Sequence, residues 1–128
     1  MVEFRSLILP GSLHVIDVLA LSGSLRAAST NSALLAALRA NALSDFHLTL
    51  YDGLGSLPIF NPDDEGERTP PLAAALIDAV ARADGIIVSC PEYAHGVPGG
   101  LKNALDWLVS RMPRSANRPC WSTPRHAR

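Results

Sequence analysis

The chain has 128 residues, of which 48% are hydrophobic and 18% charged, and its formal net charge is −1 at pH 7. These values are ordinary for one globular domain and argue against a nucleic-acid partner, which would favour a strongly basic composition. Two cysteines exclude a disulfide framework and a paired-cysteine metal site, so we expect a reducing, cytoplasmic setting and no metal.

Residues 1–14 form an N-terminal extension ahead of the first predicted element. Glu3 precedes the apolar stretch of this segment and Pro10-Gly11 interrupts it. This pattern argues against a signal peptide and against a membrane span.

The first strand, expected over residues 16–21, runs into a turn of small and hydroxyl residues, Ser22 to Asn31. A helix is predicted over 29–43, with Ser29 and Thr30 as candidate caps. Small residues let a backbone approach an anion, and the helix start supplies free N–H groups. The pattern predicts a phosphate-binding turn, to which Arg26 can add a charged hydrogen bond, although a capped helix that binds nothing is equally compatible with these residues. The predicted buried stripe of this helix comprises Ala33, Leu34, Ala37 and Leu38.

A second strand is predicted over 47–51, followed by a long loop, 52–70. Pro70 and Pro71 open a second helix, predicted over 71–83, because proline is favoured in the first turn. The side expected to face inward comprises Leu72, Ala75, Leu76, Ala79 and Val80.

The third strand is predicted over 85–90, and its β-branched run suits a strand covered on both faces. We expect Cys90, at its end, to be a small core residue. A helix over 100–109 follows, with Trp107 in the packing and a stripe of Leu101, Ala104, Leu105 and Leu108. Strands alternating with helices predict a parallel sheet, in the order 2-1-3, with a ligand site at the carboxyl ends of the first and third strands.

Two motifs carry a family resemblance. GSLRAASTN, over Gly23–Asn31, and PEYAHGVPGGLKNALDW, over Pro91–Trp107, resemble the NADPH-dependent FMN reductase family, a flavodoxin-like group that includes quinone, azo-dye and chromate reductases. The loop Leu57–Asp63 is similar to the family as well. The resemblance covers roughly residues 16–110. It implies an α/β, flavodoxin-like parallel sheet with helices on both faces, incomplete here because only strands 2-1-3 are present and the last two are missing.

The resemblance also implies an activity. The expected enzyme is an FMN-dependent oxidoreductase, in which hydride passes from NADPH or NADH to the flavin and then to a small-molecule electron acceptor, with no catalytic side chain. Intact members are commonly homodimers or homotetramers. Many members carry Asn and Ser where this chain has Ala94 and Gly96, which leaves backbone contacts there. The implied cofactor-binding residues are Ser22, Ser24, Leu25, Arg26, Ser29, Asn31, Pro91, Glu92, Tyr93, Ala94, His95 and Gly96.

Other interpretations stay open. Tyr93 can be a half-buried aromatic, Glu92 and His95 solvated loop residues, and Asn103 a helix-surface residue instead of a ligand contact. At the level of the chain, the alternatives are a flavodoxin-like electron carrier, which would not oxidise pyridine nucleotides, and a non-enzymatic remnant that binds nothing.

Residues 111–128 differ from residues 15–110, the predicted N-terminal part of the FMN-binding domain. They hold five of the eleven basic residues, no acidic residue and three prolines. This composition predicts a disordered basic tail and leaves the third strand as an open hydrophobic edge. Reading the codons of 116–127 from their third base permits KPAVLVNASPRA, which resembles the family's fourth strand, so a frameshift after Ser110 is one hypothesis. A basic arm for nucleic acid is the alternative.

Overall fold

The computed structural model describes residues 15–111, and the predictions for the N-terminal extension and for the tail beyond Arg111 lie outside the described residues. Every helix and strand expected within that range is present, in the predicted order. No helix of this part of the chain has the length and apolar character needed to cross a bilayer. The elements are β1 (Ile16–Ser22), α1 (Thr30–Ala40), β2 (Phe46–Tyr51), α2 (Pro71–Arg82), β3 (Gly85–Ser89) and α3 (Gly99–Arg111), with short 3-10 turns at Leu54–Ser56, Pro62–Asp64 and Gly66–Arg68.

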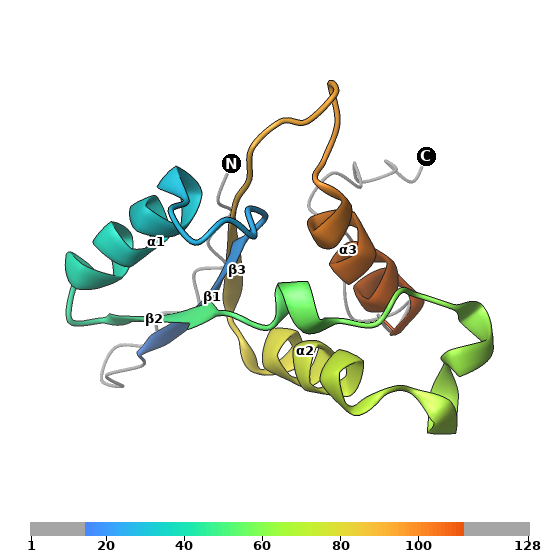
Figure 1. Ribbon diagram of the computed structural model, residues 1–128. Helices are drawn as coiled ribbons and strands as arrows, with labels where there is room; N and C mark the ends of the chain where they lie inside the picture. The colour runs from blue at the N-terminus through green and yellow to red at the C-terminus, as the bar shows by residue number, and fades with distance from the viewer. Residues whose placement is uncertain (1–14, 112–128) are drawn as a thin grey trace, which may run out of the picture.

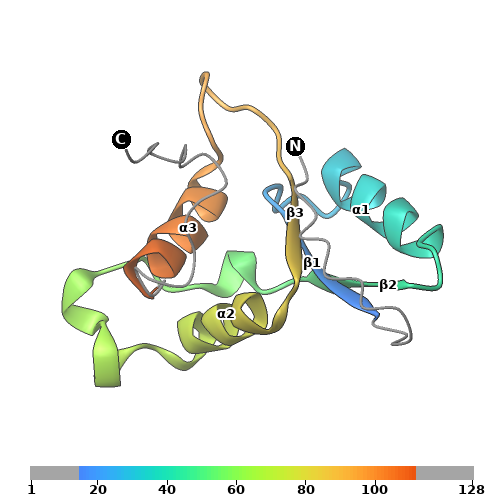
Figure 2. The same cartoon turned by 180° about the vertical axis from the view of Figure 1, so that it is seen from behind.

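The three strands form one parallel sheet in the order β2-β1-β3, which confirms the predicted order. In the register, Ser22 at the end of β1 lies beside Ser89 at the end of β3. Helix α1 covers one face of the sheet, and α2 and α3 lie on the other face (Figures 1 and 2). The molecule therefore has the three layers of a doubly wound α/β fold.

Alternation along β1 divides the core between the two faces. Ala20 packs with Leu35 of α1 and Leu48 of β2, whereas Leu19 and Leu21 pack toward α2 and α3. Because successive strand residues point to opposite faces, one apolar strand supplies both layers. The second layer is completed by Leu54, Leu57, Leu76, Leu101, Ala104 and Leu108.

Trp107 is fully buried, as expected for a core residue. Its indole Nε1 donates a 2.9 Å hydrogen bond to the carbonyl of Pro58. Its ring meets Phe60 edge to face, with centroids 5.0 Å apart. A buried tryptophan needs a partner for its N–H, and the 52–70 loop supplies that partner while closing over α3.

The predicted buried stripe of α1 is wrong. Leu34 and Leu38 are exposed, and the residue that is buried is Leu35. The reason is the rotation of the helix about its axis, because Ser32 is hydrogen-bonded to Ser22 beneath the first turn. Leu35, three residues later, shares the face of Ser32 and therefore points to the sheet.

The other stripes are confirmed in part. Leu76 is buried on α2 and Leu101, Ala104 and Leu108 on α3, but Leu72 and Leu105 are exposed. Ala79 and Val80 pack against the core at partial burial, and Ala75 is exposed.

Strand β3 is not covered on both faces, contrary to expectation. Ile86 and Val88 are 39% and 46% exposed, and within residues 15–111 β3 pairs with β1 alone. Cys90 is exposed instead of forming core, because it lies past the last paired residue of an edge strand. Within residues 15–111, the outer edge of β3 is unpaired, as the sequence predicted.

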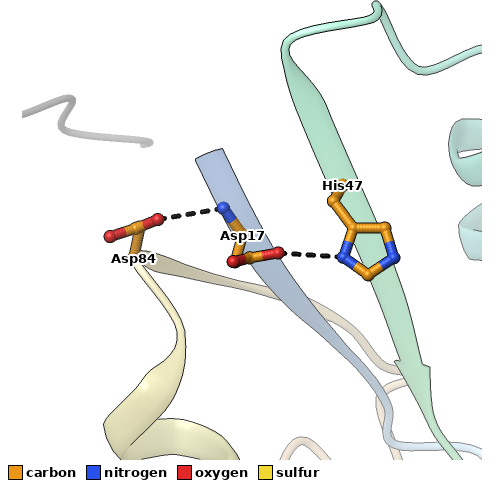
Figure 3. Close-up of polar contacts among 3 residues, drawn as sticks. All are labelled: Asp17, His47 and Asp84. Atoms are coloured by element: carbon orange, nitrogen blue, oxygen red, sulfur yellow. Dashed lines mark hydrogen bonds and ion pairs between the residues drawn. The ribbon is translucent and has the colours of Figure 1, made fainter. Parts of the chain in front are cut away.

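Polar contacts join the three strands near their amino ends. The Asp17 carboxylate lies 2.8 Å from His47 Nδ1 on β2, and Asp84, just before β3, accepts a 2.9 Å hydrogen bond from the Asp17 N–H (Figure 3). In the described range, no three His, Cys, Asp or Glu residues gather as a metal site. The contacts of Asp17 join neighbouring strands at the amino ends of the sheet, opposite to the loops after β1 and β3.

Candidate functional site

The loops after β1 and β3 meet at the carboxyl edge of the sheet. The Gly23 N–H donates a 2.8 Å hydrogen bond to the carbonyl of Ser89. A Cβ built on Gly23 would lie only 2.5 Å from the Cβ of Cys90. Glycine is thus required where the two loops begin, because no side chain fits between them.

Four serines organise the first loop. Ser22 Oγ lies 2.8 Å from Ser32 Oγ and donates a 3.3 Å hydrogen bond to the Ser24 carbonyl. Ser29 caps α1 by accepting a 3.2 Å hydrogen bond from the Ser32 N–H, as predicted. Ser24 and Ser29 are both 8% exposed. The hydroxyls of Ser22, Ser29 and Ser32 and the backbone of Ser24 therefore hold the loop in shape from inside.

The outer side of the same loop presents free donors. The backbone N–H groups of residues 25–31 make no hydrogen bond to any other described residue. Residues 25–28 are exposed, and Arg26 among them forms no ion pair within residues 15–111. Free N–H groups at the positive end of a helix dipole, beside an unpaired guanidinium, are the groups that binding of an anion requires.

Asn31 faces the third strand. Its Oδ1 accepts a 2.8 Å hydrogen bond from the Ser89 hydroxyl, although the two residues lie 58 positions apart in the sequence. Sequence reasoning included Asn31 but missed Ser89 and Ser32. The available signal for Ser89 was a hydroxyl residue at the carboxyl end of an apolar strand, where parallel sheets place their ligands.

The loop after β3 stands beyond the carboxyl edge of the sheet (Figure 1). Pro91 is half-buried and Glu92 to Gly96 are exposed. Tyr93 and Gly96 exchange two backbone hydrogen bonds, of 3.1 and 3.0 Å, around Ala94 and His95, whose φ angles are 50° and 58°. Positive φ at both central residues defines a type I′ turn, which non-glycine residues adopt at a cost of order 1 kcal/mol each. The predicted residues Glu92 to Gly96 thus lie in a stiff, exposed turn.

Side-chain contacts in this turn are few. Glu92 Oε1 lies 3.1 Å from His95 Nδ1, and both side chains are largely exposed. Tyr93 is 52% exposed, so its ring is available to a flat ligand. Asn103 is not available in that way, because its amide accepts from the Phe60 N–H and donates to the Pro58 carbonyl.

Leu25 extends from the first loop toward the start of α3. A Cβ built on Gly100 would lie 3.2 Å from Leu25 Cδ1, and one on Gly55 would lie 3.5 Å from Leu25 Cδ2. Leu25 nevertheless remains 59% exposed. Leu25 therefore packs against Gly55 and Gly100, and part of its apolar side chain is exposed to solvent beside the loop of free N–H donors.

A cavity of about 370 Å³ lies beneath the first loop, on the β2 side. Burial, and next the charge of Asp52, raise the pKa of Tyr51, so its phenol is protonated at neutral pH. The cavity is lined by Ala20, Ser22, Ser24, Leu25, Ser32, Leu35, Leu50, Tyr51, Asp52, Leu54 and Gly55. Three of the predicted cofactor-binding residues, Ser22, Ser24 and Leu25, line it, whereas no residue of the loop after β3 does.

A serine-rich loop with free N–H donors and an exposed turn thus lie at the carboxyl ends of β1 and β3 in a 2-1-3 sheet. The model of the NADPH-dependent FMN reductase family matches residues 16–122. This chain belongs to that family. The resemblance stated from the sequence motifs is confirmed.

Individual relatives of this FMN reductase family member agree with the assignment. A quinone reductase of Escherichia coli strain K12 is 36% identical over 99 residues, which are 77% of this chain and 52% of the relative. A 2-hydroxy-1,4-benzoquinone reductase of a Burkholderia species is 44% identical over 85 residues, 66% of this chain and 45% of the relative.

Among solved structures, the flavoenzyme NAD(P)H:acceptor oxidoreductase FerB of Paracoccus denitrificans is similar. Its TM-score is 0.66 at 33% identity, over 73% of this chain and 50% of that one. The flavodoxin-like fold is therefore shown. The FMN reductase family member described here spans about half the length of the relatives it matches.

Proposed function

We propose that this chain carries the flavin-binding loops of an FMN-dependent NAD(P)H oxidoreductase that reduces a small quinone-type acceptor. The observation that carries the proposal is the run of unpaired backbone N–H groups over residues 25–31 at the start of α1. Family membership supplies the context, since a flavin phosphate is the anion expected at this place. The acceptor class follows that of the relatives, which are quinone reductases.

The first loop fits the phosphate end of FMN. Its N–H groups and the dipole of α1 neutralise a dianion without a buried charge, and Arg26 is free to add a fork of two hydrogen bonds. The Ser29 hydroxyl caps the helix and the Ser24 backbone bonds to Ser22, and both residues are 8% exposed, so little of either is open to a ligand. We therefore assign binding to the backbone, Arg26 and Asn31, and shape to Ser22, Ser24 and Ser29.

The second loop fits one border of a flavin ring. Pro91 stiffens the exit from β3, and the I′ turn holds the backbone of Glu92 to Gly96 in one conformation. When bound, FMN supplies hydride acceptance from NADPH or NADH and electron delivery to the acceptor. The role of the chain is to bind and orient this group, so no side chain is assigned as an acid, base or nucleophile. A cytoplasmic homodimer or homotetramer is the assembly we propose for an intact member.

Titration of the 128-residue chain into FMN, followed by flavin fluorescence with gel filtration of the same sample, tests the proposal. We expect saturable one-to-one quenching by a defined species, and then oxidation of NADPH when a benzoquinone is added. FMN binding without NADPH oxidation would favour the electron carrier. Absence of saturable binding would contradict both and indicate a remnant.

The variant Arg26→Ala tests the contribution of the loop, because it removes the free guanidinium but no packing contact that the described residues show. We expect FMN affinity to fall by about tenfold, because one charge-assisted hydrogen-bond pair is lost. Thermal stability should stay that of the parent.

A further inference from the structure

The ends of β1 and β3 hold the first turn of α1 through two serines. Ser22 and Ser89 are register partners. The Ser22 hydroxyl lies 2.8 Å from that of Ser32, and the Ser89 hydroxyl donates to Asn31 Oδ1 over 2.8 Å. Consecutive helix residues are therefore fastened to neighbouring strands. Only the contact between Ser89 and Asn31 fixes how a side chain is oriented. An amide has an acceptor oxygen on one side and a donor nitrogen on the other, whereas a hydroxyl does not differ in this way.

The orientation matters for an anion. With Oδ1 occupied by Ser89, the remaining capacity of the Asn31 side chain is the two N–H donors of Nδ2, which have no partner within residues 15–111. They lie in the turn whose backbone N–H groups are also unpaired. Without the Ser89 hydroxyl, the amide is free to rotate and to turn its oxygen toward an approaching phosphate, which that oxygen repels.

We propose that Ser89 is a positioning residue for phosphate recognition, acting by holding the Asn31 amide with its donors toward the anion. The inference rests on the proposed function and adds to it the reason for a preference for FMN over a flavin without phosphate. Ser89 also accepts the Gly23 N–H through its carbonyl, so the same residue sets both the amide and the start of the loop. Its side chain and its backbone thus serve separable purposes.

The test compares FMN with riboflavin, which has the same ring and lacks the phosphate. In the full 128-residue chain, Ser89→Ala keeps the backbone carbonyl and removes the hydroxyl. We expect FMN affinity to fall by about tenfold while riboflavin affinity stays unchanged, because only the phosphate senses the amide. Ser89→Thr, which restores a hydroxyl, should recover the preference of the parent for FMN.

Ser44→Ala is the matched control, since among residues 15–111 the exposed Ser44 hydroxyl bonds only to the neighbouring Asp45. It should leave both affinities unchanged. Equal weakening of FMN and riboflavin by Ser89→Ala would overturn the inference, since that result indicates a structural role alone. No loss of FMN affinity in Ser89→Ala would overturn it as well, because the ratio of FMN affinity to riboflavin affinity would again be that of the parent.

A second readout needs no flavin. Inorganic phosphate is titrated while the side-chain amide resonances of Asn31 are followed by NMR, and we expect them to shift in the parent and in Ser89→Thr but not in Ser89→Ala. A parent that binds neither flavin but shows this shift contradicts the proposed oxidoreductase function and leaves the positioning role supported. A parent whose amide does not respond to phosphate overturns the positioning role.

Discussion

Gly23 shows how one residue can determine whether the two loops of the site coexist. A Cβ at this position would lie 2.5 Å from Cys90 Cβ and 3.2 Å from Leu101 Cδ2. The closest atom belongs to a short side chain next to a strand, so it has little room to move. Glycine is therefore needed here because there is no room for a side chain. A left-handed backbone is not the reason, because Gly23 is not among the glycines of positive φ.

We expect Gly23→Ala to lower the free energy of unfolding by about 1–3 kcal/mol, the cost of overpacking a close contact. Urea denaturation measures this. Gly85→Ala is the matched control, because a Cβ built there meets nothing within 4 Å, and it should leave stability equal or slightly raised. Adding Cys90→Gly to Gly23→Ala should recover part of the loss. Equal stability of the Gly23 and Gly85 variants would show that the loops can separate without cost.

Three separate contacts hold the first turn of helix α1. Ser29 caps it, Ser22 reaches Ser32, and Ser89 reaches Asn31. The cap was predictable, because it depends on residues close together in the sequence. The rotation that buries Leu35 depends on strand ends distant in sequence, and for this reason the apolar pattern alone indicated the wrong stripe.

Ser29→Ala should lower the free energy of unfolding by about 1 kcal/mol through loss of the N-cap hydrogen bond. Ser29→Asp retains an acceptor and adds a charge that the helix dipole favours, so it should match the parent or exceed it. Chemical denaturation followed by circular dichroism compares the two. If Ser29→Ala and Ser29→Asp lost equal stability, the contribution of Ser29 would be packing in its buried position and not capping.

The sheet formed by the described residues has an uncovered edge at β3. Among residues 15–111, β3 has a partner on one side, and Ile86 and Val88 expose 39% and 46% of their surface. A strand edge with free N–H and C=O groups beside apolar side chains is a template for pairing with another chain. The three-layer core is complete around β1 and open at β3.

The chain should consequently self-associate as its concentration rises, and Val88→Lys should raise the concentration needed by about tenfold, because a charged residue at an edge disfavours pairing. Analytical ultracentrifugation over a concentration series measures the effect. Leu34→Lys is the control, since Leu34 is 53% exposed on α1 and away from this edge. A larger effect of the Leu34 variant would locate the contact on α1 instead.

The element order, the parallel 2-1-3 sheet, the family and the loops expected to form the site could all be predicted from the sequence. These features follow from local periodicity, capping residues and contiguous motifs, which need only neighbouring residues to be read. Only the packed structure showed which face of α1 is buried, that Cys90 is exposed, and that Ser89 contacts Asn31 across 58 positions. Such contacts depend on how separate elements pack and twist together, and no local pattern contains that information.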